Sequence, residues 1–189
     1  MAKKEIETGH YLYPMPAVLV GASVNGKPNY LVAAFCGIVD LKPPKVAVAL
    51  GKAHYTNIGI KEHNSFSVSV PGTNIAEKVD YCGLQTGHKT DKSTIFRSWY
   101  GKLVNAPMPE ECPICLECKL VKTLELDVDE LFIGEIVASW VEEDVLTKEG
   151  KPDMTRVDPL VFAMGTKDYW KIGDRVGGAW SMGKEYKPD

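Results

Sequence analysis

The sequence predicts a mainly β chain that folds as a closed or nearly closed antiparallel barrel with a few short helices. It contains many short β-branched or alternating segments, few short helical segments, and no regular strand–helix–strand alternation. A parallel sheet needs that alternation, because a crossover helix joins its successive strands. The 189 residues fit one domain, residues 1–189, and 44% hydrophobic with 25% charged residues is a globular composition.

The first half of the chain opens with a predicted hairpin. Residues 17–23 are small and β-branched, Asn25-Gly26 can supply the positive φ angles of a tight turn, and residues 30–35 form the returning strand. The paired prolines within residues 40–44 predict an extended loop, and residues 45–50 alternate like a strand. The barrel therefore begins with strands that are close neighbours in sequence.

Two helices and one strand follow. Thr56 is predicted to cap a short helix over residues 57–63, and Asn74 with Glu77 has the form of a capping box that opens a helix through about Tyr81. Between them, Ser-Phe-Ser-Val-Ser-Val at residues 65–70 alternates strictly. We expect a half-buried strand with its serines on the polar face.

The second half is dominated by a predicted long hairpin. Residues 83–93 are polar, basic and glycine-containing, which indicates a loop. Residues 116–127 and 131–142 are strand-like and flank an acidic turn, so we expect them to pair. Residues 160–164 form a last short strand, and the glycine-rich residues 173–183 predict no regular structure.

Composition excludes several classes of function. A net charge of −3 and a pI near 5.8, without a local basic stripe, argue against nucleic-acid binding. No apolar run approaches the ~20 residues that span a bilayer, and no signal peptide is visible, so we expect a cytoplasmic protein without membrane contact. An odd number of cysteines, five, fits reduced thiols better than a disulfide framework.

Hydrolytic and metal chemistry lack convincing candidates. The four histidines form no His-Glu-x-x-His pair, and no Gly-x-Ser-x-Gly elbow is present. Cys112, Cys115 and Cys118 have spacings that resemble those of zinc or iron–sulfur ligands. A strand starting near Ile114 would point Cys115 and Cys118 in opposite directions, so we expect no metal there.

Three segments are candidates for binding a ligand. In the first, small side chains would let a flat ring lie against the backbone, although the same run would serve as barrel core. Its residues are Asn29, Tyr30, Leu31, Val32, Ala33, Ala34, Phe35 and Cys36.

The second and third segments have the composition of phosphate-binding loops. One leads into a helix N-terminus, which attracts anions, and carries Lys52, His54, Tyr55 and Thr56. The other concentrates hydroxyls, a glycine and lysines at Thr86, Gly87, Lys89 and Lys92. The alternatives are that Thr56 is only a cap and that the later loop is only solvated. Neither loop matches a Walker or a dinucleotide-binding glycine motif.

The ordered series of motifs resembles the flavin reductase-like, or flavoredoxin-like, family. The series covers nearly the whole chain, and its order carries more information than any single piece. It runs through Asn29-Tyr30-x-x-Ala-Ala, Leu41-Lys42-Pro43-Pro44, Tyr55-Thr56-Asn57-Ile58, Ser-Phe-Ser-Val-Ser-Val, Thr86-Gly87-x-x-x-Asp91-Lys92, Glu117-Cys118, Phe132-Ile133-Gly134-Glu135-Ile136 and Tyr169-Trp170-x-Ile-Gly.

This resemblance implies an FMN-binding split β-barrel of Greek-key type, commonly a homodimer with FMN at its interface. Electrons would come from NADH or NADPH, or from a redox protein, and pass to a flavin, ferric or protein acceptor. Asn29 and residues 33–36 would face the isoalloxazine with Phe35 beside it, and the two loops would hold the ribityl chain and phosphate, with Lys92 the foremost candidate. The alternatives are a flavoredoxin-type carrier without nicotinamide activity and a non-catalytic ligand-binding barrel.

The chain departs from the family pattern in two respects. Relatives often carry an aromatic residue, frequently Trp, near Phe35, and a His shortly before the Phe-Ile-Gly-Glu strand, where this chain has Asp129-Glu130. They also often show Arg where His54 or His88 stands. A neutral imidazole lends no positive charge, so we expect phosphate binding either to be weaker than in those relatives or to depend on pH.

Overall fold

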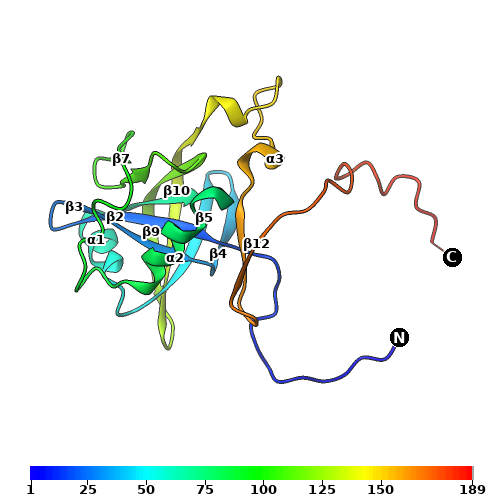
Figure 1. The fold of residues 1–189 in the computed structure, drawn as a ribbon, viewed down its shortest axis with the longest axis horizontal. Helices are drawn as coiled ribbons and strands as arrows, with labels where there is room; N and C mark the ends of the chain where they lie inside the picture. Colours follow the sequence, from blue (N-terminus) through cyan, green and yellow to red (C-terminus); the bar gives the residue numbers. More distant parts are fainter. Residues whose placement is uncertain (189) are drawn as a thin grey trace.

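The computed structural model describes residues 1–188, and it is mainly β, with 41% of residues in strands and 14% in helices. Every strand pairing among these residues is antiparallel. The strands wrap into one body, and both chain ends leave that body on the same side (Figure 1). The predicted class, a mainly β antiparallel fold with few helices, is confirmed.

The body is built on a seven-stranded sheet with the order β3-β2-β6-β9-β10-β5-β4. Asn25 and Gly26 adopt φ angles of 51° and 73°, which are the positive values that the predicted two-residue turn between β2 and β3 requires. The predicted long hairpin is also confirmed as β9 paired with β10. The seven strands are β2 (Val18–Val24), β3 (Lys27–Ala33), β4 (Cys36–Leu41), β5 (Pro44–Gly51), β6 (Ser65–Val70), β9 (Ile114–Glu125) and β10 (Asp129–Val141).

Smaller elements surround this sheet. A three-stranded sheet joins β1 (Met15–Pro16), β11 (Leu160–Ala163) and β12 (Asp168–Lys171), and a two-stranded one joins β7 (Ser98–Trp99) and β8 (Met108–Pro109). The helices are α1 (Thr56–His63), α2 (Ala76–Leu84) and α3 (Met154–Val157), with 3₁₀ turns η1 (Thr73–Ile75) and η2 (Glu143–Val145). No helix in residues 1–188 is long and apolar enough to cross a membrane.

Two hydrophobic clusters lie on opposite faces of the large sheet. Val20, Phe66 and Phe132 belong to one cluster, whereas Leu19 and Tyr30 belong to the other, as alternation along β2 dictates. The expectation of a half-buried β6 is therefore wrong, because its serines are buried too. The segment before β8 crosses that face, and the Ser67 hydroxyl donates a hydrogen bond to the Pro107 carbonyl.

The helix starts also differ from expectation. Thr56 is the first residue of α1 rather than its cap, and the residue in the cap position, Tyr55, makes no side-chain cap bond. The capping box at Asn74 is absent as well, because Asn74 lies in η1 and α2 begins only at Ala76 and continues to Leu84. Neither Thr56 nor Asn74 therefore caps the helix that its sequence position predicted.

The remaining differences concern lengths of strands. The loop predicted at residues 40–44 shrinks to Lys42-Pro43, because β4 continues to Leu41 and β5 begins at Pro44. The strand β12 was not predicted as an element, although it contains Tyr169 and Trp170. No helix or strand occurs in residues 173–183, as predicted.

Candidate functional site

A polar cavity of about 140 Å³ lies where β3, the start of α1 and the loop after α2 meet. Its walls include Asn29, Leu31, Thr56, Thr86, Gly87 and Lys92. A more open cavity of about 350 Å³ adjoins it and shares Asn29, Tyr55, Gly87 and Lys92 with it. We call the pair the cationic cavity, for the lysine that both share. Lys92 and Thr56 therefore face one space that a single ligand can fill.

Lys92 is the central charge of this cavity. Its side chain is nearly inaccessible, at 3% exposure, and its Nζ donates to the carbonyls of Tyr30 and Cys82, each at 2.8 Å. An ammonium has three donors, so one remains for the cavity. No carboxylate of residues 1–188 forms an ion pair with it. Burial lowers the pKa of Lys92, and an anion beside it would reverse that effect.

Thr56 and Asn29 form the opposite wall. The Asn29 amide donates to Thr56 Oγ1 at 2.7 Å, and both side chains are buried. Because that oxygen accepts from Asn29, the threonine hydroxyl proton is free to point to a ligand. The amides of Asn57 and Ile58 are bonded to the carbonyls of His54 and Tyr55. The hydroxyl of Thr56, rather than these helix amides, is thus the donor offered here.

Gly87 allows the loop after α2 to close against this wall. A Cβ at this position would lie 2.3 Å from Tyr55 Cδ1 and 2.6 Å from Asn29 Oδ1. Only a glycine fits at that distance. The loop itself is turned by Thr86, whose carbonyl accepts from the amides of Lys89 and Thr90. Tyr55 is held in turn by an edge contact with His88 at 4.9 Å between ring centroids.

His54 lines the smaller part of the cavity and responds to its charge. Its pKa is lowered, first by burial and then by the positive charge of Lys92, with Asp129 acting weakly in the opposite sense. The imidazole is therefore neutral at pH 7 and would gain a proton more readily if an anion occupied the space.

The small-residue segment continues the cavity along β3. Side chains alternate along a strand, so Asn29, Leu31 and Ala33 share a face, and the first two line the cavity. The chain then bends into β4, where Cys36 pairs with Val48 of β5. Phe35 stacks on His10 of the N-terminal arm, with ring centroids 5.5 Å apart and planes 25° apart. A ligand anchored at Lys92 could extend along this strand toward Phe35.

The structure separates some of the predicted site residues from the cavity. Tyr30 and Val32 point to the other face of β3, into or against the second core cluster, where Tyr30 Oη bonds Ser98 Oγ at 2.7 Å. Only the Tyr30 carbonyl takes part, through Lys92. Lys52 lies 3.9 Å from Glu125 and is not among the lining residues, whereas Lys89 lines the open part.

Sequence reasoning missed several residues at this site. Gln85 lines the cavity, and Asn25 donates to Tyr55 Oη at 3.0 Å. Lys27 forms an ion pair with Asp91 at 2.6 Å across the open part. Asn25 was assigned only to the tight turn, so its hydrogen bond to Tyr55 was not predicted. Lys27 and Asp91 are far apart in sequence and meet only in the folded chain.

The three cysteines with metal-like spacing do not converge on one point. Cys112 and Cys115 belong to the second core cluster, whereas Cys118 lies in the first, on the opposite face of β9. This is the separation that strand alternation predicted. All five cysteines of the chain are free thiols.

The fold and this cavity define a class of protein, the split β-barrels, and solved structures of that class match the chain over most of its length. Flavoredoxin from Methanosarcina acetivorans is 43% identical, with 97% of this chain and 98% of that chain covered and a TM-score of 0.94. Flavoredoxin of Desulfovibrio vulgaris (Miyazaki F) is 36% identical, with 97% and 100% covered and a TM-score of 0.92. An FMN-binding protein from Thermus thermophilus, at 22% identity and a TM-score of 0.79, with 94% and 98% covered, shares the fold.

The family follows from the sequence as well. The model of the flavin reductase like domain matches residues 10–171. The chain belongs to that family, and the resemblance inferred from its motifs is confirmed.

Proposed function

We propose that the chain binds FMN in the cationic cavity and passes electrons from NADH, NADPH or a protein donor to a flavin, ferric or protein acceptor. The observation that carries this proposal is Lys92, a buried ammonium without a carboxylate partner in the described chain, facing a cavity across from a free hydroxyl proton. A buried charge is costly unless it is paired. The phosphate of FMN would supply the missing partner.

The residues present fit such a ligand. Lys92 and Thr56 can each donate to a phosphate oxygen, and Gly87 leaves the space that a side chain would otherwise fill. From there β3 leads to Ala33, Ala34 and Phe35, where small side chains would admit a flat ring and Phe35 would cover its edge. When bound, FMN supplies the redox chemistry itself, and the chain supplies binding, orientation and exclusion of water. No side chain need act as an acid or base.

A flavoredoxin-type carrier is the second candidate, because two similar structures with 43% and 36% identity are described as flavoredoxins. In that case a redox protein, rather than a nicotinamide, would be the electron donor. The two candidates share the FMN site and differ in the donor.

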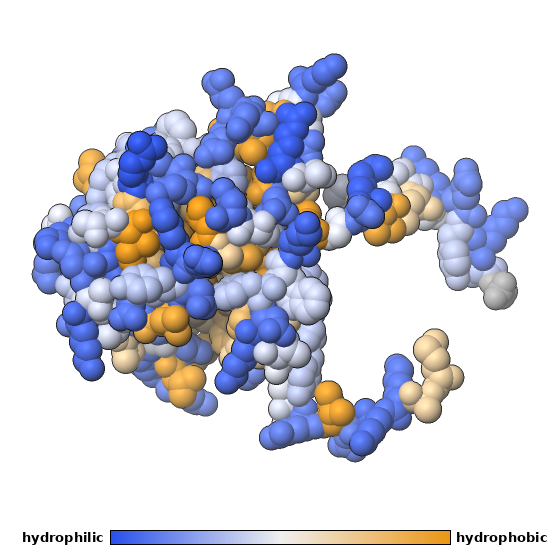
Figure 2. Space-filling model, in the orientation of Figure 1, coloured by the Kyte–Doolittle hydropathy of each residue, from blue (hydrophilic) through white to orange (hydrophobic). Residues whose placement is uncertain are grey.

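We also propose that the protein works as a homodimer. The edge strand β4 exposes Ile38, Val39 and Leu41 at 60%, 54% and 81%. An exposed apolar edge strand favours pairing with another chain. Figure 2 shows the N- and C-terminal arms standing clear of the body, with apolar side chains among polar ones. A second copy would cover these surfaces. The five free thiols support a reducing compartment, the cytoplasm.

A visible spectrum of the purified protein, before and after FMN is added, tests the first step. We expect a bound flavin band, and a protein that stays colourless after FMN addition and gel filtration would instead be a non-catalytic barrel. Anaerobic addition of NADH or NADPH should then bleach the band. Bleaching only after a reduced redox protein is supplied would favour the carrier.

Substitution of Thr56 tests the site itself. Thr56→Val removes the hydroxyl that would meet the phosphate and should weaken FMN binding by roughly tenfold, the effect of one hydrogen bond to a charged group. Thr56→Ser keeps the hydroxyl and should retain affinity. Lys119→Gln, on the exposed part of β9, is the matched control. Equal FMN affinity in Thr56→Val and Thr56→Ser would place the ligand elsewhere.

A further inference from the structure

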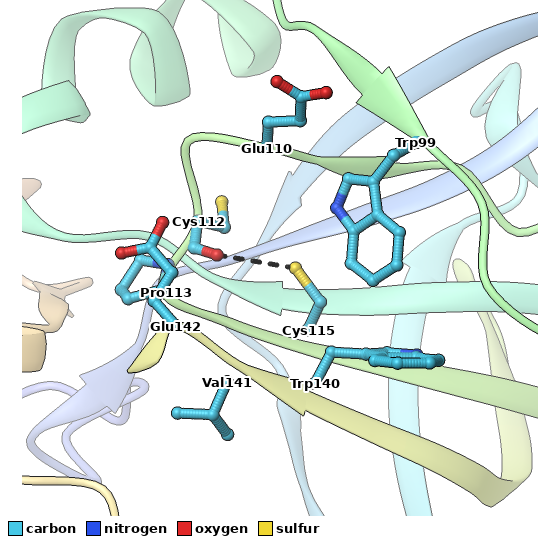
Figure 3. A pocket seen from close by; sticks show the side chains of 8 residues that line it. All are labelled: Trp99, Glu110, Cys112, Pro113, Cys115, Trp140, Val141 and Glu142. Atoms are coloured by element: carbon cyan, nitrogen blue, oxygen red, sulfur yellow. Dashed lines mark hydrogen bonds between the residues drawn. The ribbon is translucent and has the colours of Figure 1, made fainter. Parts of the chain in front are cut away.

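A second cavity of about 450 Å³ lies beside β7, the start of β9 and the end of β10, and none of its lining residues lines the cationic cavity. Figure 3 shows two indole rings, two thiols and two carboxylates around it. These belong to Trp99, Glu110, Cys112, Cys115, Trp140 and Glu142. We call it the tryptophan cavity. The proposed flavin site does not include this cavity.

The aromatic walls are fixed in place. Trp99 and Trp140 meet edge to face, with ring centroids 5.3 Å apart and planes at 83°. Trp140 Nε1 donates to Glu117 Oε2 at 2.7 Å, and Glu117 is fully buried. The same carboxylate accepts from the amides of Lys102 and Leu103 at 3.0 and 2.7 Å. Trp140 is therefore held before any ligand arrives, which reduces the entropy lost on binding.

The charge around the cavity is negative. The Glu117 carboxylate accepts from Nε1 at the edge of the Trp140 ring, and such a bond shifts electron density into the indole. At the rim, Glu110 is paired with Arg97 at 2.7 Å. Glu142 has no cation within ion-pair distance among residues 1–188. Burial and the neighbouring Asp144 raise the pKa of Glu142, so a cation at this rim would stabilise its charged form.

The thiols contribute apolar surface rather than ligands for a metal. Burial raises the pKa of Cys115 to about 11 and raises that of Cys112 as well, so both stay protonated at neutral pH. Cys115 Sγ points toward the carbonyl of Cys112 at 3.6 Å, as Figure 3 shows. A neutral thiol floor beneath two indoles favours a ligand with an apolar body.

We propose that the tryptophan cavity binds a small organic cation, an alkylated ammonium or a guanidinium carrying an apolar group. The indole rings of Trp99 and Trp140 would make cation–π contacts with the charged group of the ligand, since cations are attracted to indole rings within about 6 Å of the centroid. Glu142 would pair with its charge at the rim. The apolar body would lie over the two thiols. This site is independent of the flavin site, so its test does not depend on FMN binding.

Calorimetric titration of the full-length protein with choline, set against its uncharged carbon analogue 3,3-dimethyl-1-butanol, isolates the charge. The two probes have nearly the same shape. We expect saturable binding of one choline per chain, at least about tenfold tighter than the alcohol. A titration with N-butylguanidinium would show whether a guanidinium is also accepted. Equal affinity for choline and the alcohol, or no saturable choline binding, would overturn the proposal.

Two variants locate the bound cation. Glu142→Gln removes the rim charge with little change of shape and should weaken choline binding about five- to tenfold. Trp99→Leu removes one aromatic wall and should weaken it similarly. Glu143→Gln, the next residue along the chain and outside the cavity lining, is the matched control and should bind choline normally. Because Glu142 lies on the surface, its substitution should not affect folding, which far-ultraviolet circular dichroism would verify. Unchanged choline binding in both variants would refute the assigned site.

Discussion

Two buried charged side chains of this protein, Lys92 and Glu117, differ in how completely their bonding capacity is used. Glu117, at 0% exposure, accepts hydrogen bonds from two backbone amides and the Trp140 indole. Lys92, at 3% exposure, donates to two carbonyls and still faces a cavity. A carboxylate whose oxygens are all hydrogen-bonded to protein donors, as in Glu117, fixes the positions of those donors. A charge with a donor to spare, facing a cavity, indicates a place for a ligand of opposite sign.

Substituting Lys92 should give the largest effect on ligand binding. Lys92→Met keeps an apolar stem but removes the charge, and FMN binding should weaken by roughly 10- to 100-fold, as expected for a lost charge-assisted hydrogen bond. Titration of the apoprotein with FMN, followed by flavin fluorescence, measures this. Lys119→Gln serves as the control. A folded Lys92→Met protein that binds FMN within twofold of the wild type would remove Lys92 from the site.

Substituting Glu117 should affect stability and leave flavin binding intact. Glu117→Gln turns an amide group toward three N–H donors, so at least one donor loses its acceptor, at a cost of about 1–3 kcal/mol. Urea unfolding should show this loss, and the indole signal of Trp140 in a nitrogen–proton spectrum should shift. Lower FMN affinity without lower stability would contradict the expectation that Glu117 supports the fold and takes no part in flavin binding.

The contrast between these two side chains also shows what the sequence could and could not predict. The β2–β3 turn at Asn25-Gly26 and the β9–β10 hairpin depend on residues near each other in the chain, and both were predicted. Lys92 was selected as a cation in a basic loop, but its bond to the Tyr30 carbonyl spans 62 positions in sequence. No local pattern reveals such a partner.

The same reason explains the errors. Thr56 has the form of a helix cap, yet Asn29, 27 positions earlier, bonds its hydroxyl oxygen. The serines of β6 alternate as if exposed, yet the chain near Pro107 covers them. The tryptophan cavity was not foreseen because Trp99 and Trp140 meet only through the fold. Local patterns thus predicted the strands, and long-range contacts decided which polar groups are buried and where they point.

Lowering the pH should have opposite effects on the stability of the apoprotein and on its affinity for FMN, both through His54. Its pKa is lowered from 6.5 in the folded apoprotein by burial and by Lys92. The stability that the neutral imidazole contributes is therefore present above the unfolded pKa and is lost as pH falls below it. A bound phosphate should raise the pKa of His54 instead, because its negative charge favours the imidazolium. We expect FMN affinity to rise modestly from pH 8 to pH 6.

The variant His54→Gln separates this effect from the titration of the phosphate itself, whose second pKa is near 6. The rise in FMN affinity from pH 8 to pH 6 should be smaller in His54→Gln. The pH dependence that remains in this variant would come from titration of the phosphate. FMN titrations at several pH values in the two proteins measure the difference. If FMN affinity depended on pH in the same way in both proteins, His54 would not interact with the phosphate.

The smallest effect is expected at the exposed ion pair beside the cavity. Lys27 and Asp91 lie 2.6 Å apart, and their side chains are 65% and 50% exposed. The pairing raises the pKa of Lys27 and lowers that of Asp91, but solvent screens exposed charges and two long side chains lose freedom on pairing. Lys27→Gln should therefore leave the urea midpoint unchanged at physiological salt, although Asp91 is the direct neighbour of Lys92. If the midpoint instead fell as far as in Glu117→Gln, this exposed ion pair would hold the loop after α2 as strongly as the buried hydrogen bonds of Glu117 hold their surroundings, and solvent screening would not explain its contribution.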